Sequence, residues 1–204
     1  MFLFHRSLRV VVQTQQATRR AVGGVTLPEG VLWRRAETQL ATRLGLFPGD
    51  RAVVLSPPER DPAATLAGRL PRIRFFQVGS PDGVFGWQGP KGALARIRAE
   101  PLLPPFPDEA VDACIVLFAA TLLPGPQHRR LVEAWSTTLY PFGKWLELVA
   151  VDGPKDPRLA AGEVHLKESG FEKVRSMRLA LGRMGAALYL QSGRWPGLGE
   201  GDEE

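Results

Sequence analysis

Three histidines and one cysteine are the first side chains of this sequence to consider as metal ligands or nucleophiles. His5, His128 and His165 share no His-x-x-x-His spacing and no adjoining carboxylate cluster, so we expect no metal site. Cys114 lies within an apolar run, where a thiol is normally an inert core side chain. There is no Gly-x-Ser-x-Gly elbow and no phosphate loop ending in Gly-Lys-Ser/Thr, which argues against a hydrolase or a nucleotidase.

A turn that follows an apolar run is the other place where chemistry could reside. Residues 55–61 read Leu-Ser-Pro-Pro-Glu-Arg-Asp and lead into a helix for which Asp61 suits the N-cap and Pro62 the first helical position. Glu59 and Asp61 would lie at the positive end of the helix dipole, where they would compete with an anionic ligand. The two prolines remove two N–H donors. We therefore expect an ordinary strand-to-helix turn here.

The hydrophobic pattern predicts helices and strands in alternation. Helical spacing of apolar residues indicates helices at 31–44, 62–70, 126–139 and 163–169. Short apolar runs predict strands at 51–55, 73–78, 111–118, 145–151, 171–175 and 186–190. Segment 93–97 fits a short helix or a strand, and the prolines of 101–107 predict a loop. Residues 140–143 should end the helix expected at 126–139.

Strands that alternate with helices predict an α/β fold. We expect a doubly wound, mostly parallel sheet of the seven-stranded type, with helices on both faces and a reversed edge strand formed near the end of the chain. The 204 residues, 44% of them apolar, suit one domain. Residues 1–30 would form an N-terminal arm or capping segment, 31–193 the domain, and 194–204 an acidic tail.

Charge and cysteine content limit the surroundings of the protein. The net charge is +5, and the basic residues are scattered, as is typical of a solvated surface, although an RNA-binding face also fits them. A single cysteine excludes an intrachain disulfide and favours a reducing, cytoplasmic location. The longest wholly apolar stretch, 113–120, is too short to cross a membrane, so we expect no membrane association.

Four segments share their pattern with one protein family: Gly45–Leu55, Leu103–Asp112, Leu139–Val149 and Glu168–Val174. In order, they resemble the lead-in to the first strand, the "LPF-acid…FD" entry to the fourth strand, the "L-x-P-G-G" before the fifth strand, and a later "x-x-G-F-x-x-V" entry. The family is the class I S-adenosylmethionine-dependent methyltransferases, especially the small-molecule branch that includes quinone-biosynthesis enzymes. The resemblance extends over about residues 30–192 and implies the Rossmann-like methyltransferase fold.

The resemblance also implies where S-adenosylmethionine would bind. The glycine-rich turn of the family corresponds to residues 55–61, which contain no glycine, so Ser56 and Glu59 are the candidates for contact with the methionyl part. Gln77 stands where the family has an acid that accepts bonds from the ribose hydroxyls. Glu100 would approach the adenine amino group, unless it is a solvated surface acid. Phe118 would lie where substrate and methyl group meet, unless it is a core side chain.

Two functions are compatible with these residues. The glycine-free turn favours a catalytically silent member of the fold that binds no cofactor and acts as a binding or assembly protein, its cleft filled by Pro57, Pro58 and Trp87 or Phe118. The alternative is an active, divergent methyltransferase acting on a small molecule or RNA, because methyl transfer depends mainly on positioning and needs no catalytic dyad. The expected partners are an unidentified protein or a small molecule. RNA and a second copy of the chain are partners that the sequence also allows.

Overall fold

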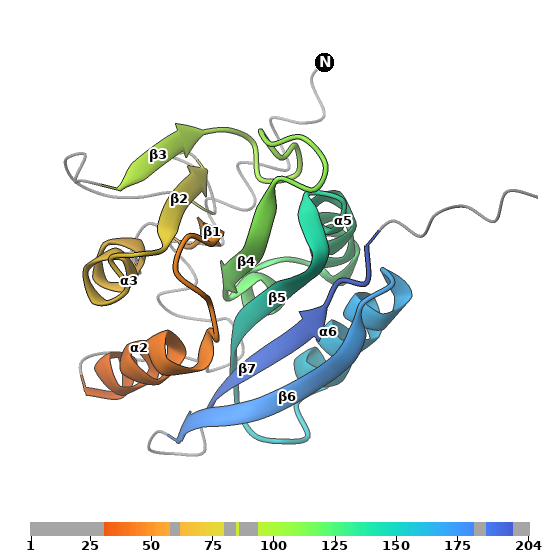
Figure 1. The fold of residues 1–204 in the computed structure, drawn as a ribbon. Coiled ribbons are helices and arrows are strands. Elements are labelled where there is room, and N and C mark those ends of the chain that lie inside the picture. The colour runs from red at the N-terminus through yellow and green to blue at the C-terminus, as the bar shows by residue number, and fades with distance from the viewer. Residues whose placement is uncertain (1–30, 58–61, 80–84, 86–93, 182–186, 198–204) are drawn as a thin grey trace, which may run out of the picture.

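The computed structural model describes residues 31–57, 62–79, 85, 94–181 and 187–197. They form a seven-stranded sheet in the order β3-β2-β1-β4-β5-β7-β6 (Figure 1). The strands are β1 (Arg51–Leu55), β2 (Arg74–Gly79), β3 (Ala95–Arg98), β4 (Val111–Leu117), β5 (Leu139–Val151), β6 (Glu172–Leu181) and β7 (Ala187–Arg194). The strands from β3 to β5 in this order are parallel neighbours, and β7 runs antiparallel between β5 and β6. The predicted doubly wound sheet with a reversed strand is confirmed.

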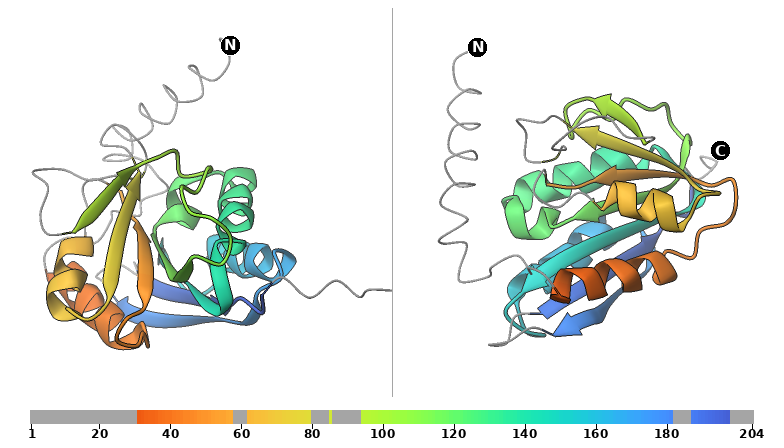
Figure 2. Two further views of the ribbon diagram at one scale, coloured as in Figure 1. Left: turned by 45° about the horizontal axis from the view of Figure 1, so that its top comes forward. Right: turned by 90° about the vertical axis from the view of Figure 1, so that its left-hand side faces the viewer.

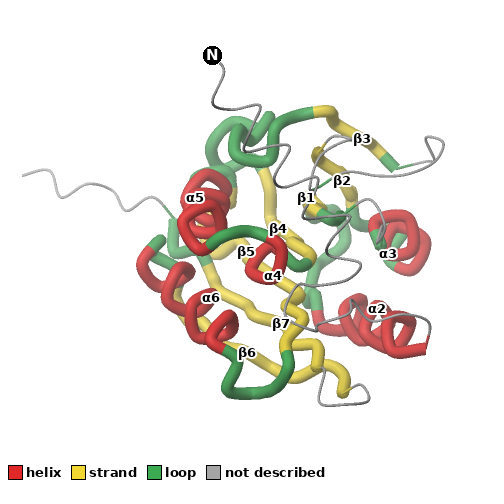
Figure 3. The backbone as a smooth tube through the Cα atoms, turned by 180° about the vertical axis from the view of Figure 1, so that it is seen from behind, coloured by secondary structure: helices red, strands yellow, loops and turns green. Residues whose placement is uncertain are grey.

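Helices cover both faces of this sheet. One face carries α2 (Val31–Arg43) and α3 (Ala63–Arg69), and the other carries α4 (Ala119–Leu122), α5 (Gly125–Ser136) and α6 (Pro157–Glu168) (Figures 2 and 3). Each face has its own apolar core, built from helix residues and from alternate residues of the strands. None of the helices in the described ranges combines the length and the apolar character that a bilayer span requires.

The central strand β4 is buried on both faces, as its uninterrupted apolar run predicts. Ile115 packs in the core under α2 and α3, whereas Cys114 and Val116 pack in the core under α5 and α6. Burial, and then the charge of Glu147, raises the pKa of the Cys114 thiol well above its ordinary value. The thiol therefore stays protonated and unreactive, as expected for a core cysteine.

Helix α6 begins at Pro157, six residues before the predicted start at 163. Asp156 is its N-cap and accepts a hydrogen bond from the backbone N–H of Arg158 at 2.9 Å. The guanidinium of Arg158 also bonds to this carboxylate, and its hydrogen bond is the main reason that the pKa of Asp156 falls to about 2. An Asp-Pro pair is a good helix start, so the sequence contained the signal for this boundary.

Strand β5 also begins earlier than predicted, at Leu139, and residues 140–143 belong to this strand instead of forming a separate turn. Leu139 pairs with Val111, but Lys144 pairs with Ala113, so the residues between them bulge out of the ladder. Phe142, at the bulge, has a φ of 69°. The bulge is held by the chain end, because Phe142 N–H donates to Trp195 O and Trp195 N–H donates to Gly143 O at 2.8 Å.

Smaller differences concern other boundaries. Segment 93–97, whose sequence fits a short helix or a strand, contributes to β3 (Ala95–Arg98). The short helix α4 was not predicted, and α3 starts at Ala63 after an N-cap Pro62 that makes no side-chain capping bond. Residues 194–197, expected to open an acidic tail, include the last residue of β7 and the buried Trp195. Asp61, residues 1–30 and residues 198–204 lie outside the described residues.

Candidate functional site

Two predicted site residues meet at the carboxyl ends of β1 and β2. Register pairs Val54 of β1 with Gln77 of β2, and Ser56 follows β1 directly, so the two polar side chains leave the sheet at one edge. Gln77 Nε2 donates a hydrogen bond to Ser56 Oγ at 3.2 Å, and both residues are fully buried. The structure therefore brings these two residues together, with each facing the other.

A third residue, Arg96, completes this cluster. Arg96 of β3 is the register partner of Gln77, and its Nε donates to Gln77 Oε1 at 3.1 Å. The oxygen and the nitrogen of the Gln77 amide thus both have protein partners. Sequence reasoning missed Arg96, because segment 93–97 could not be assigned to a strand and its register with β2 was unknown.

Phe118, directly after β4, lies in the core. It is fully buried in the apolar cluster under α2 and α3, together with Leu117 and Leu148. Its φ of 65° is unusual for a residue other than glycine, and its N–H donates to Leu148 O at 2.7 Å. The strained backbone lets the chain turn from β4 into α4. Phe85 is also fully buried, in the cluster of the opposite face that contains Leu55.

The other predicted site residues are more scattered. Glu100 is exposed, and its carbonyl accepts the N–H of Leu103 at 2.9 Å. Pro57 is buried beside Ser56. Glu59, Pro58 and Trp87 lie outside the described residues.

A second polar cluster lies under α4, α5 and α6. Glu147 of β5 is fully buried, and its Oε2 accepts from His128 Nε2 at 2.8 Å and from Trp145 Nε1 at 3.2 Å. Its Oε1 accepts the backbone N–H of Ala120 at 2.7 Å. His128 of α5 is buried, and its Nδ1 lies 2.8 Å from Nδ1 of His165 on α6. Glu147 thus connects β5 with α4 and α5, and His128 extends the connection to α6.

The charges in this cluster follow from its donors. The indole and backbone N–H groups are neutral donors, so the buried charge of Glu147 has to be compensated by a proton on His128. Burial alone lowers the pKa of His128, but the charge of Glu147 and the hydrogen bond to it outweigh burial and raise that pKa. Burial, and then the charge of His128, lowers the pKa of His165. A protonated His128 can therefore donate to a neutral His165.

The sequence alone does not predict this cluster, because the spacing of the two histidines is not that of metal ligands. They are separated by 37 residues, and His128 and Glu147 by 19, so no local spacing links them. Within the described part of the chain, no group of three or more His, Cys, Asp or Glu side chains has an arrangement that could hold a metal ion. Glu147 is inaccessible to solvent, so this cluster is suited to hold the helices against the sheet.

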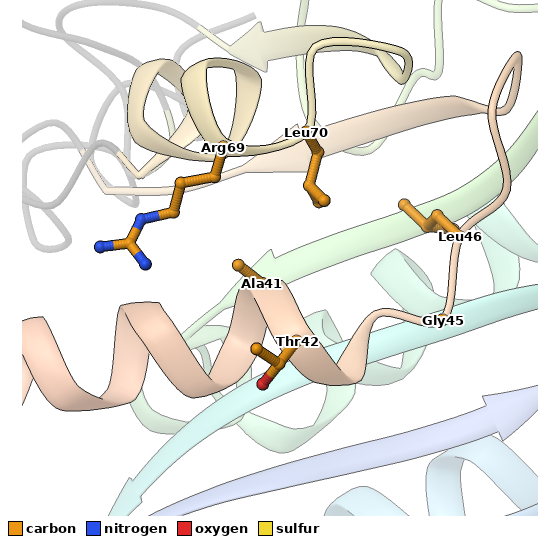
Figure 4. Close-up of a pocket in the computed structure, with 6 residues that line it drawn as sticks. All are labelled: Ala41, Thr42, Gly45, Leu46, Arg69 and Leu70. Carbon is orange, nitrogen blue, oxygen red and sulfur yellow. The ribbon is translucent and has the colours of Figure 1, made fainter.

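A surface pocket of about 590 Å³ lies at the opposite edge of the sheet, between the ends of α2 and α3. It is lined by Ala41, Thr42, Gly45, Leu46, Arg69 and Leu70 (Figure 4). In the close-up, Ala41, Leu46 and Leu70 point into it, and the guanidinium of Arg69 extends away along α2. Because α2 leads into the amino end of β1, this pocket is remote from Ser56 and Gln77 and is no part of that cluster.

Several solved structures with the same fold are methyltransferases. The chain is similar to a Haloferax volcanii complex between the Trm112 methyltransferase activator and a methyltransferase, with a TM-score of 0.63 and 15% identity over 93% of this chain and 96% of the other. It is also similar to a SAM-dependent methyltransferase from Aquifex aeolicus (TM-score 0.61, 13% identity, 80% and 92% covered) and to the apo form of the S-adenosylmethionine-dependent methyltransferase SibL (0.62, 14%, 96% and 71%).

These likenesses show the fold, which is that of class I S-adenosylmethionine-dependent methyltransferases. No family model matches the sequence, and no curated protein matches it.

Proposed function

We propose that this chain has the methyltransferase fold but has lost S-adenosylmethionine binding, and that it acts as a binding or assembly protein. The observation that carries the proposal is the chain of hydrogen bonds from the half-buried Arg96 through Gln77 to Ser56, both of which are fully buried. In the family that the sequence resembles, a carboxylate at the place of Gln77 accepts bonds from the ribose hydroxyls. Here an amide is bound on one side by a guanidinium and on the other by a hydroxyl, so the residues present do not fit the nucleotide.

The turn after β1 supports the same conclusion. A glycine-rich turn lets a ligand approach the backbone closely, whereas Ser56 and Pro57 are side chains that are already buried against the protein. Pro57 has no N–H to offer a carboxylate. The degenerate turn, together with the burial of Phe118 in the core, favours the silent protein over the active enzyme.

A protein is the partner that we expect first. One structural neighbour was solved as a complex between a methyltransferase and the Trm112 methyltransferase activator, which is a case of this fold acting as a subunit. A small molecule of the kind used by the quinone-biosynthesis branch is the substrate class to test if the cofactor does bind. A single cysteine, buried in the core, suits the reducing cytoplasm, where we expect the protein to act.

Calorimetric titration of the full chain with S-adenosylmethionine and with S-adenosylhomocysteine tests the loss of cofactor binding. We expect no saturable heat and no change in melting temperature with either compound. Geranyl diphosphate methyltransferase, a structural neighbour solved in complex with SAM, serves as the positive control under the same conditions. Saturable binding at one site per chain would show that the alternative, an active and divergent methyltransferase, is correct.

A further inference from the structure

Helix α2 covers only part of one face of β5, β7 and β6. The part of this face beyond the end of α2 carries positive charge. Register places Lys144 of β5 opposite Arg194 of β7, and Arg175 of β6 opposite Ser192, two residues from Arg194. Arg43, the last residue of α2, reaches the same face, where its Nη1 lies 2.7 Å from Met177 Sδ. In Figure 1, β5, β7 and β6 have α5 and α6 behind them, on the opposite face.

These four cations differ in their partners from Arg51, Arg129 and Arg158. Arg51, Arg129 and Arg158 each have a carboxylate within 4.0 Å. Among the residues that the structure describes, Arg43, Lys144 and Arg175 have neutral acceptors instead, namely Met177 Sδ, the carbonyls of Leu44 and Gly45, and Ser192 Oγ at 3.4 Å from Arg175 Nε. The guanidinium of Arg194 contacts the Phe142 ring, and no described carboxylate forms an ion pair with it. Their charge is therefore not compensated within the described protein.

Two exposed phenyl rings lie among these cations. Phe47 is 71% exposed and Phe142 is 61% exposed. The guanidinium of Arg194 lies 4.2 Å from the centre of the Phe142 ring, and Lys144 Nζ lies 5.9 Å from the centre of the Phe47 ring. We call the surface formed by Arg43, Phe47, Phe142, Lys144, Arg175 and Arg194 the basic face.

The arrangement of charge on the basic face is unfavourable without an external anion. Lys144 and Arg194 are directly opposite in an antiparallel ladder, where like charges destabilise the pair. Glu172 is opposite Arg194 on the other side, but no ion pair joins them within the described residues. Asp50, the other carboxylate near Phe47, is engaged with the Phe47 N–H at 2.8 Å. A bound phosphate between Lys144 and Arg194 would relieve the repulsion.

We propose that the basic face binds single-stranded RNA. Phosphates supply the missing negative charge, and bases can stack on exposed rings and on planar guanidinium groups, a combination that proteins use for single strands. The carboxylate side chains of an acidic protein would satisfy the charges, but unlike bases they carry no aromatic ring that could stack on the two exposed rings. The proposal goes beyond the loss of cofactor binding and does not depend on it, because the basic face is at the opposite edge of the sheet from Ser56 and Gln77.

Fluorescence anisotropy with a labelled single-stranded RNA of about 16 nucleotides, a length within the range that one small domain can cover, tests the proposal on the full chain without cofactor. We expect binding that weakens steeply as KCl rises. The double variant R175Q/R194Q should bind about tenfold more weakly, and its salt dependence should be shallower by about 0.7 for each phosphate that it no longer neutralises. The variant F47A/F142A should bind about tenfold more weakly with the same salt dependence.

The matched control is R129Q/R130Q, which removes two positive charges from the exposed surface of α5 and should bind RNA as the unchanged protein does. Melting curves check that each variant is folded, and the single change R175Q, at an exposed position, replaces the double variant if that one unfolds. The proposal is wrong if RNA does not bind at low salt, or if the variants of the basic face bind as tightly as the control. It is equally wrong if polyglutamate displaces RNA at equal charge concentration and F47A/F142A has no effect, since the partner is then an acidic protein.

Discussion

His128 and His165 face each other across the contact between α5 and α6, with their Nδ1 atoms 2.8 Å apart. At this distance one ring must donate and the other accept, so the contact is favourable only while one of the two Nδ1 atoms carries a proton and the other does not. Glu147 keeps the proton on His128, and burial together with the positive charge of His128 keeps His165 neutral. The pKa of His128 is therefore raised and the pKa of His165 is lowered, relative to the ordinary histidine value.

The stability of the protein should depend on pH through this pair. The pKa of His128 is raised above 6.5, so its stabilising contribution is complete below 6.5 and is lost as the pH rises through its folded pKa. The pKa of His165 is lowered below 6.5, so protonation of His165 destabilises the fold as the pH falls from 6.5 through its folded pKa. The groups that face His165 are His128 and Arg129 of α5, Glu168 of α6 and Glu147 of β5. We expect the contribution of the pair to be greatest near pH 6.5.

Urea unfolding at a series of pH values, with H165Q as the comparison, measures this effect. The difference in unfolding free energy between the unchanged protein and H165Q should become smaller as the pH falls below 6.5, because only the unchanged protein has a second imidazole to protonate. If this difference is constant from acidic to neutral pH, the two rings are not coupled as described.

Replacement of Glu147 by glutamine should destabilise the protein strongly. The change removes the buried anion and leaves His128 without its counter-ion, and the loss of one partner of a buried pair costs about 3–5 kcal/mol. The pKa of His128, measured by NMR titration, should fall at the same time. The matched control is E133Q on the surface of α5, where a half-exposed ion pair with Arg129 contributes at most about 1 kcal/mol. Equal effects of the two substitutions would contradict the charge assignment.

Gly162 of α6 should not tolerate a side chain. A Cβ at this position would overlap Oε1 of Gln191, a fully buried residue whose Nε2 donates to Leu159 O at 2.7 Å. We expect G162A to lower the free energy of unfolding by about 1–3 kcal/mol through overpacking, measured by urea denaturation. In α3 the same change, G68A, meets no atom within 4 Å and should stabilise the protein by about 0.5–1 kcal/mol, because alanine favours a helix. A neutral G162A would show that Gln191 can move aside.

Gln77 should act as a structural residue. In the variant Q77A, Ser56 and Arg96 would each be deprived of a hydrogen-bond partner in buried or half-buried positions, which costs about 1–3 kcal/mol for an unsatisfied group. The free energy of unfolding of the ligand-free protein should fall by this amount. A residue reserved for a ligand would instead leave the stability of the ligand-free protein almost unchanged, so an unaltered unfolding curve would count against the proposed loss of cofactor binding.

The local pattern of the sequence determined the alternation of elements and most of the sheet. β1 and β4 were predicted within one residue, because strands buried on both faces appear as continuous apolar runs. The boundaries that were missed depend on tertiary contacts. The early start of β5 needs the pairing of Leu139 with Val111 and of Gly143 with Trp195, and neither partner is near in sequence.

The candidate site shows the same division. The glycine-free turn and the glutamine at the end of β2 could be found in the sequence, because they depend only on residue type and on the end of a strand. The bonds of Gln77 to Ser56 and to Arg96 were decided by strand order and register, which place residues 21 and 19 positions apart side by side. The pairing of His128 with Glu147 and His165, and the uncompensated charges of Lys144 and Arg194, likewise arise only where separate elements pack together. Hydrophobic periodicity is a property of one segment, whereas a hydrogen bond or an ion pair between two segments exists only once the fold has brought them within reach.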